Sequence, residues 1–167
     1  MRSHVRLAIL ECDTPLNGTR AKYGNYTGVF TALLHAAADI LGVPRDTVSF
    51  TGWDVVEKGE YPDLQDIDAV LITGSKYSAY ESAPWNLRLI EFVKMVLEQR
   101  RVRLVGVCYG HQIVARAMGI RVARNEKGWE TSVYEMQPTE KGKEVFGKDT
   151  LVRHNTISLL QAIDLRC

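Results

Sequence analysis

The chain has 167 residues and a net charge of +1, with 46% hydrophobic and 25% charged residues. These values are typical of one globular domain and exclude a disordered chain or a general attraction to nucleic acid or anionic lipid. No apolar run reaches the ~18 residues of a membrane-spanning helix, and the N-terminus lacks the pattern of a secretion signal. Three cysteines in a chain of this size favour a reducing compartment, so we expect a cytoplasmic protein.

The first half of the chain alternates strand and helix patterns. Residues 5–10 (VRLAIL) predict a strand, and the turn-rich segment that follows leads to apolar residues at helical spacing from Val29 to Leu41. Gly42 and Pro44 end that predicted helix. Two further strands are expected at residues 47–53 and 67–73, the second running directly into Gly74.

The second half continues the alternation and then changes character. Residues 103–107 (RLVGV) predict a strand, and residues 109–118 predict a helix that Gly119 ends. Beyond it, residues 121–125 and 129–137 are expected to be strands, and residues 138–149 a short helix or turn. Between the strands expected at residues 67–73 and 103–107, Pro84 begins a predicted helix. Its apolar face, directed to the core, is formed by Trp85, Leu89, Phe92 and Val96.

Strands that alternate with helices predict an α/β fold, an open and mostly parallel sheet with helices on both faces. We interpret residues 1–167 as one domain, because no repeat or interdomain linker interrupts the pattern. In such sheets ligands bind beyond the carboxyl ends of the strands. The strand ends at Gly74 and Cys108 are therefore the candidate site. The histidines are too scattered for a metal site, and no phosphate-binding or dinucleotide motif is present, so we expect neither metal nor cofactor.

The stretch from Gly106 to Gly110 reads G-x-C-x-G and is typical of a nucleophile elbow, a sharp strand-to-helix turn that lifts a side chain above the sheet. The helix that begins behind Cys108 directs its unpaired N–H groups toward the sulfur and favours the thiolate. The N–H of Tyr109 is one candidate donor to a developing oxyanion, and Gly74 or its neighbour is the second. A buried structural cysteine is the alternative interpretation.

These motifs resemble those of class I glutamine amidotransferase domains. The resemblance extends over about residues 5–147 and rests on four segments: KYGNYTGVF, LITGSKYSAYE with the following PW, GVCYGHQIVARAMG, and KGWE. Among family members, the segments are most similar to those of stand-alone fungal amidotransferase-like proteins and plant γ-glutamyl peptidases. The resemblance implies a flavodoxin-like three-layer fold whose C-terminal part is incomplete here.

The resemblance also implies a reaction. Cys108 attacks the γ-carbonyl of glutamine or of a γ-glutamyl compound and forms a thioester that water hydrolyses. Gly74 and Tyr109 then donate backbone N–H groups to the oxyanion, and Gln112 helps to hold the substrate. A chain of this kind acts on a small γ-glutamyl compound or delivers ammonia to a synthetase partner. No nucleic-acid or membrane partner is expected.

The family takes its base from a later histidine that is followed two residues on by a carboxylate, and this chain has no such pair. His154 is followed by Asn155 and Thr156, and the tail differs from the family from about Val152. We therefore expect a truncated, spliced or mispredicted product, or a member that lost its triad. His154 is the candidate base, whereas His111 is interpreted as structural. Without a base, catalysis loses roughly 10²- to 10⁴-fold.

Two further hypotheses remain open at this point. The chain could be a non-catalytic interaction protein that retains the fold without its base. Alternatively, it could be a cysteine protein of the DJ-1 and PfpI type, in which a carboxylate at the end of the first strand pairs with the elbow cysteine. Glu11 occupies that position, although the GHQ sequence after Cys108 argues against this type.

Overall fold

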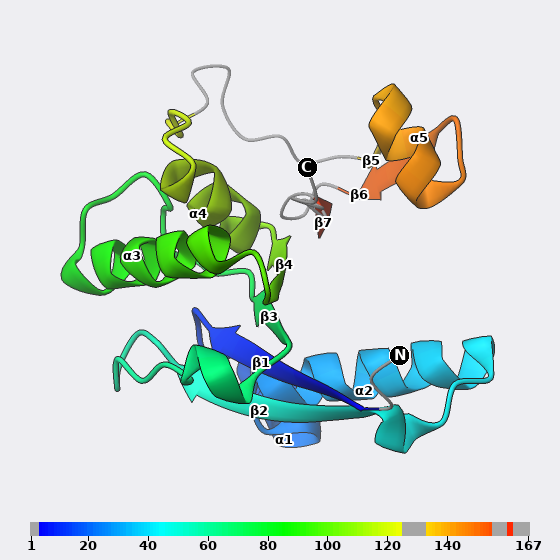
Figure 1. The fold of residues 1–167 in the computed structure, drawn as a ribbon, viewed down its shortest axis with the longest axis horizontal. Coiled ribbons are helices and arrows are strands. Elements are labelled where there is room, and N and C mark those ends of the chain that lie inside the picture. The colour runs from blue at the N-terminus through cyan, green and yellow to red at the C-terminus, as the bar shows by residue number, and fades with distance from the viewer. Residues whose placement is uncertain (1–3, 125–132, 155–159, 162–167) are drawn as a thin grey trace.

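The computed structural model describes residues 4–124, 133–154 and 160–161. Its main sheet has the strand order β2-β1-β3-β4-β7, and Figure 1 shows how the strands follow one another. The first four strands are parallel, and β7 is antiparallel to β4. These strands are β1 (Val5–Glu11), β2 (Val48–Asp54), β3 (Ala69–Ile72), β4 (Arg103–Val107) and β7 (Leu160–Gln161). The predicted α/β class, with a mostly parallel sheet, is confirmed.

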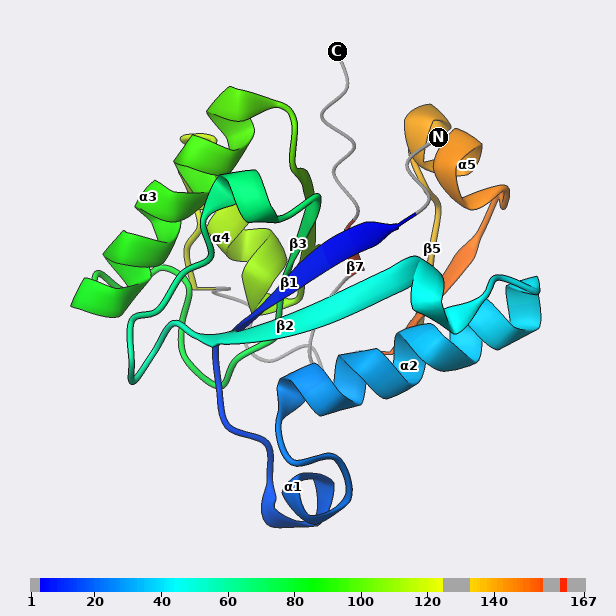
Figure 2. The ribbon, with the colours of Figure 1, turned by 60° about the horizontal axis from the view of Figure 1, so that its bottom comes forward.

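Helices cover both faces of this sheet. α2 lies along β1 and β2 on one face, whereas α3 and α4 lie along β3 and β4, and Figure 2 shows the sheet running between the two groups. The connections β1-α2-β2 and β3-α3-β4 lead in opposite directions along the sheet, so right-handed crossovers place their helices on opposite faces. The helices are α1 (Asn17–Tyr23), α2 (Tyr26–Leu41), α3 (Pro84–Gln99), α4 (Tyr109–Ala117) and α5 (Glu140–Phe146).

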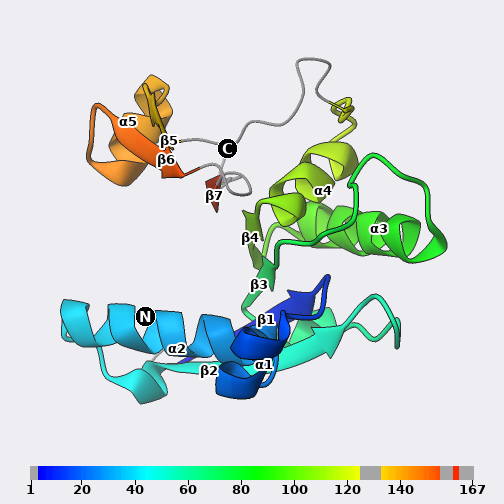
Figure 3. The ribbon, with the colours of Figure 1, turned by 180° about the vertical axis from the view of Figure 1, so that it is seen from behind.

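A second, two-stranded antiparallel sheet joins β5 (Val133–Met136) and β6 (Leu151–His154). α5 connects these two strands, and Figure 3 shows the three elements grouped apart from α3 and α4. The expected short helix at residues 138–149 is confirmed as α5. Thr139 begins it, since its side chain accepts a hydrogen bond from the N–H of Gly142 at 3.1 Å. Of the strand expected at residues 129–137, residues 129–132 lie outside the described residues.

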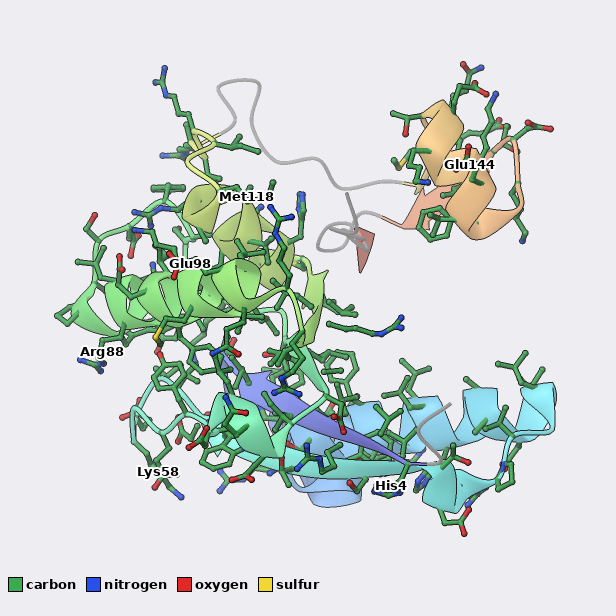
Figure 4. All side chains as sticks on the ribbon, viewed as in Figure 1. His4, Lys58, Arg88, Glu98, Met118 and Glu144 are labelled. Carbon is green, nitrogen blue, oxygen red and sulfur yellow. The ribbon has the colours of Figure 1, made fainter. Side chains whose placement is uncertain are left out.

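The hydrophobic core lies between the sheet and the pair α3 and α4. Residues of β1, β3, β4 and both helices form one buried cluster, and the predicted core-facing side of α3 is confirmed, because Leu89, Phe92 and Val96 are each at most 4% exposed. Charged side chains such as Lys58, Arg88 and Glu98 lie on the outside of the molecule (Figure 4). α2 differs from α3, because none of its residues is buried.

Two expectations about local structure are wrong. The strand expected at residues 121–125 does not form over its described part, residues 121–124, where only Val122 packs against the core. The turn-rich segment after β1 contains the helix α1, which the sequence did not predict. α1 has no buried residue, so no apolar stripe marked it.

Candidate active site

Cys108 lies at the sharp turn between β4 and α4, where it is the residue that begins the helix. Its backbone has φ 56° and ψ −109°, a conformation that residues with a side chain rarely adopt and that costs of order 1–3 kcal/mol. The flanking glycines allow the turn to pack tightly. A Cβ atom at Gly106 would lie 2.6 Å from the N atom of His111, and one at Gly110 would lie 2.4 Å from the carbonyl oxygen of Ile72.

The turn brings Cys108 beside Gly74, the residue at the end of the neighbouring strand β3. A Cβ atom built on Gly74 would lie 3.6 Å from the Cβ and 4.0 Å from the Sγ of Cys108. The thiol is free, and the residue is 5% exposed. Behind it, the N–H of Gln112 donates to the Cys108 carbonyl at 3.2 Å and closes the first turn of α4. Cys108 thus lies at the positive, N-terminal end of α4.

The loop that carries Gly74 is held against the end of β1. The N–H of Lys76 donates to Asp13 Oδ2 at 2.7 Å, and Lys76 Nζ lies 2.8 Å from Asp13 Oδ1. One residue before Gly74, Thr73 accepts from the N–H of Cys12 at 2.9 Å and donates to the Gly74 carbonyl at 3.0 Å. Sequence reasoning missed this Asp13–Lys76 pair. Its signal was the position of both residues just after strands that are neighbours in the sheet.

Tyr26, the first residue of α2, is a second group that the sequence did not single out. Burial raises its pKa, the negative charge of Asp13 raises it further, Lys76 opposes the shift, and Cys108 adds to it. The phenol therefore lies within electrostatic reach of Cys108 and of the Asp13–Lys76 pair. The helix α2 thus brings its N-terminus to the same edge of the sheet as the elbow.

The side chain of Tyr109 points into the protein, while its backbone N–H belongs to the elbow. Tyr109 is 1% exposed, and burial raises the pKa of its phenol. Its hydroxyl donates to Oδ1 of Asn86, which is also 1% exposed. The Tyr109 ring stacks on Trp85 with 5.7 Å between ring centroids.

Three residues are candidates for the base or for the acidic partner of Cys108, and the structure describes their side chains to different extents. The backbone of His154 forms the end of β6 and pairs with Val133, but its side chain lies outside the described residues. His111 follows the elbow in the first turn of α4 and is half-buried. The Glu11 carboxylate accepts hydrogen bonds from the N–H and the hydroxyl of Thr27, at 2.8 and 2.5 Å. In the part of the chain that the structure describes, it makes no hydrogen bond to Cys108, which counts against the DJ-1 type.

A cavity of about 160 Å³ opens at the carboxyl ends of β1 and β2 and reaches the loop after β3. The strand order changes direction between β1 and β3, the usual place for a ligand in an open α/β sheet, so the cavity lies beside that point. Cys108, Gly74 and Tyr109 are not among its lining residues. Its lining carries charges of both signs, from Glu11, Asp13, Arg20, Asp54, Glu57 and Lys76. Lys76 belongs both to this lining and to the loop that carries Gly74.

Among residues 4–124 and the other described ranges, no three or more histidine, cysteine or acidic side chains are grouped as metal ligands. No helix in the described part of the chain is long and apolar enough to cross a bilayer.

Known proteins similar to this chain include fungal and plant sequences. A glutamine amidotransferase-like protein of Schizosaccharomyces pombe is 39% identical over 149 residues, which cover 87% of this chain and 60% of that protein. Gamma-glutamyl peptidase 4 of Arabidopsis thaliana is 34% identical over 111 residues, covering 64% of this chain and 39% of that protein. This chain thus spans about 60% of the length of the first relative.

The fold has counterparts among solved structures. A glutamine amidotransferase from Thermotoga maritima superimposes with a TM-score of 0.65 at 20% identity, covering 90% of this chain and 59% of that one. Another glutamine amidotransferase, from Methylobacillus flagellatus, gives a TM-score of 0.61 at 21% identity, covering 90% and 53%. At these identities the likeness shows the fold alone. The model of the glutamine amidotransferase class-I family matches residues 23–160, and this chain belongs to that family.

Proposed function

We propose that this protein is a cysteine hydrolase that acts on the γ-amide of glutamine or on a γ-glutamyl compound. The observation that carries the proposal is Cys108, a free cysteine in a strained elbow at the start of α4 and directly beside Gly74. Family membership and the relatives named as γ-glutamyl peptidases support this substrate class.

In the proposed reaction, the Cys108 thiolate forms a bond to the γ-carbonyl carbon. The carbonyl oxygen becomes an oxyanion that accepts hydrogen bonds from the backbone N–H groups of Gly74 and Tyr109. The C–N bond then breaks, and ammonia or an amine leaves with a proton from the base. Water attacks the resulting thioester and gives up a proton to the same base, the C–S bond breaks, and the base returns the proton to the sulfur, so glutamate and the free thiol are released. Gln112, in the first turn of α4, helps to hold the glutamyl group.

We propose His154 as the base. Six residues after it, Leu160 pairs with Val107, the residue directly before Cys108. A connection of six residues spans at most ~20 Å, so the chain after His154 returns to the strand of the nucleophile. The charged cavity at the carboxyl ends of β1 and β2 shares Lys76 with the loop that carries Gly74, and its charges of both signs suit the ammonium and carboxylate of an amino-acid end.

The proposal is tested by glutamate release from glutamine and from γ-glutamyl peptides. We expect native protein to release glutamate and Cys108→Ser to lose the activity, because a serine hydroxyl in this site lacks the reactivity of a thiolate. His154→Asn is expected to lower turnover roughly 10²-fold or more, whereas His111→Asn retains most of it. Equal release by native protein and Cys108→Ser would remove Cys108 as the nucleophile.

A further inference from the structure

We infer that Arg116 and Asn86 are positioning residues for the oxyanion hole. Together they hold the loop between β3 and α3, residues 73–83, at the distance from the Cys108 elbow where two backbone donors can face one oxygen. The inference rests on the proposed function, since it assigns roles in the same reaction.

The loop needs such a support because of where it lies. It begins at Thr73 and Gly74, beside the sulfur, and continues without regular structure to the start of α3. Asp13 holds its first part through Lys76. The start of the loop is placed beside the elbow by the sheet, because Ile72 of β3 pairs with Gly106 of β4. Beyond Ile72 this pairing ends, and the rest of the loop is held by contacts between side chains and backbone.

Arg116 makes the first of these contacts. It belongs to the last turn of α4, and its Nη1 donates to the carbonyl of Ala79 at 2.5 Å and to that of Glu81 at 2.7 Å. Ala79 is 1% exposed, so the loop is packed into the protein at this residue. Arg116 is seven residues after Tyr109, which places both side chains on the same face of α4.

Asn86 makes the second contact, from α3. Its Nδ2 donates to the carbonyl of Ser78 at 3.2 Å and to that of Glu81 at 3.0 Å. Its Oδ1 accepts from the hydroxyl of Tyr109. One buried amide thus joins the loop to the residue that follows the nucleophile. The Glu81 carbonyl accepts from both Arg116 and Asn86. The loop is therefore joined to α4 directly by Arg116 and indirectly by Asn86, through Tyr109.

This arrangement has a catalytic consequence beyond folding. Removing one oxyanion donor typically lowers kcat by roughly 10²- to 10³-fold, and a displacement of about 1 Å can cost about 10²-fold. A loosened loop would therefore reduce acylation by a carbonyl substrate. Alkylation of the thiol by iodoacetamide forms no oxyanion and would not depend on the loop. The two reactions separate a positioning role from general damage to the elbow.

The experiment compares Arg116→Met, which retains the apolar stem but no donor, with Arg116→Lys and with Arg103→Met. Arg103 is an exposed residue on β4 and serves as the matched control. The readouts are kcat and KM for γ-glutamyl p-nitroanilide, the iodoacetamide rate at the Cys108 peptide measured by mass spectrometry, and deuterium uptake of residues 73–83. Asn86→Leu is a fourth variant, used where circular dichroism shows a native fold.

For Arg116→Met we expect kcat to fall about 10- to 100-fold, KM and the alkylation rate to change less than about threefold, and deuterium uptake of the loop to rise. Arg116→Lys should recover part of kcat, because one ammonium can still donate to a carbonyl. Arg103→Met should match native protein. Unchanged kcat in Arg116→Met would overturn the inference, and so would an equal loss of turnover and alkylation.

A failure of the proposed function gives a different result. In that case native protein shows no turnover that depends on Cys108, and the deuterium uptake alone decides the inference. Higher uptake at residues 73–83 in Arg116→Met, but not in Arg103→Met, would support the positioning contact. Uptake equal to that of native protein would refute it.

Discussion

Two tyrosines with buried hydroxyl groups differ by one hydrogen bond. The Tyr109 hydroxyl donates to Asn86, whereas the Tyr61 hydroxyl has no hydrogen-bond partner in the described structure. The Tyr61 ring packs on Phe92 with 4.9 Å between centroids, and the Tyr109 ring packs on Trp85, so both rings make an aromatic contact. The hydroxyl groups therefore contribute with opposite sign to stability.

We expect Tyr109→Phe to lower the free energy of unfolding by about 1–3 kcal/mol, because it leaves a buried amide oxygen of Asn86 without a donor. Tyr61→Phe should be neutral or slightly stabilising, because it removes a polar group that makes no bond. Urea denaturation of both variants measures the difference. A loss in Tyr61→Phe as large as that in Tyr109→Phe would contradict this account.

Tyr61 also predicts a dependence of stability on pH. Burial raises its pKa to about 12 from an ordinary value of 10.0, so the folded protein disfavours the phenolate. The stabilisation from this shift is complete below the unfolded pKa and is lost as pH rises through the folded pKa. Native protein should therefore lose stability between about pH 10 and 12 relative to Tyr61→Phe. If the denaturation midpoints of native protein and Tyr61→Phe change in parallel between about pH 10 and 12, the effect is excluded.

At the scale of elements, α2 is hydrogen-bonded to the end of β1 at its N-terminus and packs on β2 further along, where the His35 and Phe50 rings lie 5.3 Å apart. Asn25 accepts from the N–H of Gly28 at 2.9 Å, and Glu11 at the end of β1 accepts from both donors of Thr27. At its C-terminus the helix keeps large apolar residues exposed, with Ile40 at 85% and Leu41 at 75%. The first turn therefore fixes where α2 begins, through hydrogen bonds to Glu11.

Glu11→Ala is expected to lower the free energy of unfolding by about 1–2 kcal/mol, the range for loss of a helix cap. Glu11→Gln, which retains an acceptor oxygen, should cost less. Neither variant should change the iodoacetamide rate at Cys108, because Glu11 is bonded to Thr27 and makes no hydrogen bond to the sulfur in the described structure. A changed alkylation rate in both variants would revive the pairing of Glu11 with the cysteine.

At the scale of the whole molecule, the carboxyl ends and the amino ends of the parallel strands have different roles. The carboxyl ends of β1, β3 and β4 carry the candidate site. At the amino ends, Asp68 accepts from the N–H and the Nε of Arg6, at 3.0 and 3.1 Å, and its carbonyl accepts from the N–H of Arg103 at 3.0 Å. Asp68 thus ties together three parallel strands at the edge farthest from Cys108.

Asp68→Ala should therefore lower stability without altering chemistry. We expect the free energy of unfolding to fall by about 1–3 kcal/mol, the range for leaving hydrogen-bonding groups unpaired. The kcat per folded molecule should stay at the native value, measured well below the melting temperature. A selective fall of kcat in Asp68→Ala would show that the two edges are coupled.

The sequence by itself determined the alternation of strands and helices, the elbow at Cys108 and the glycine at the end of β3, because periodicity and glycine spacing are local signals. It missed α1, which lacks a buried face, and it placed a strand at residues 121–125 where none forms in the described part. Only the tertiary structure decided that Asp13 meets Lys76, that Tyr26 lies within electrostatic reach of Cys108, and that Arg116 and Asn86 hold one loop. Those contacts join residues far apart in the chain, and their partners are mostly backbone carbonyls and N–H groups, which every residue type offers and no sequence pattern distinguishes.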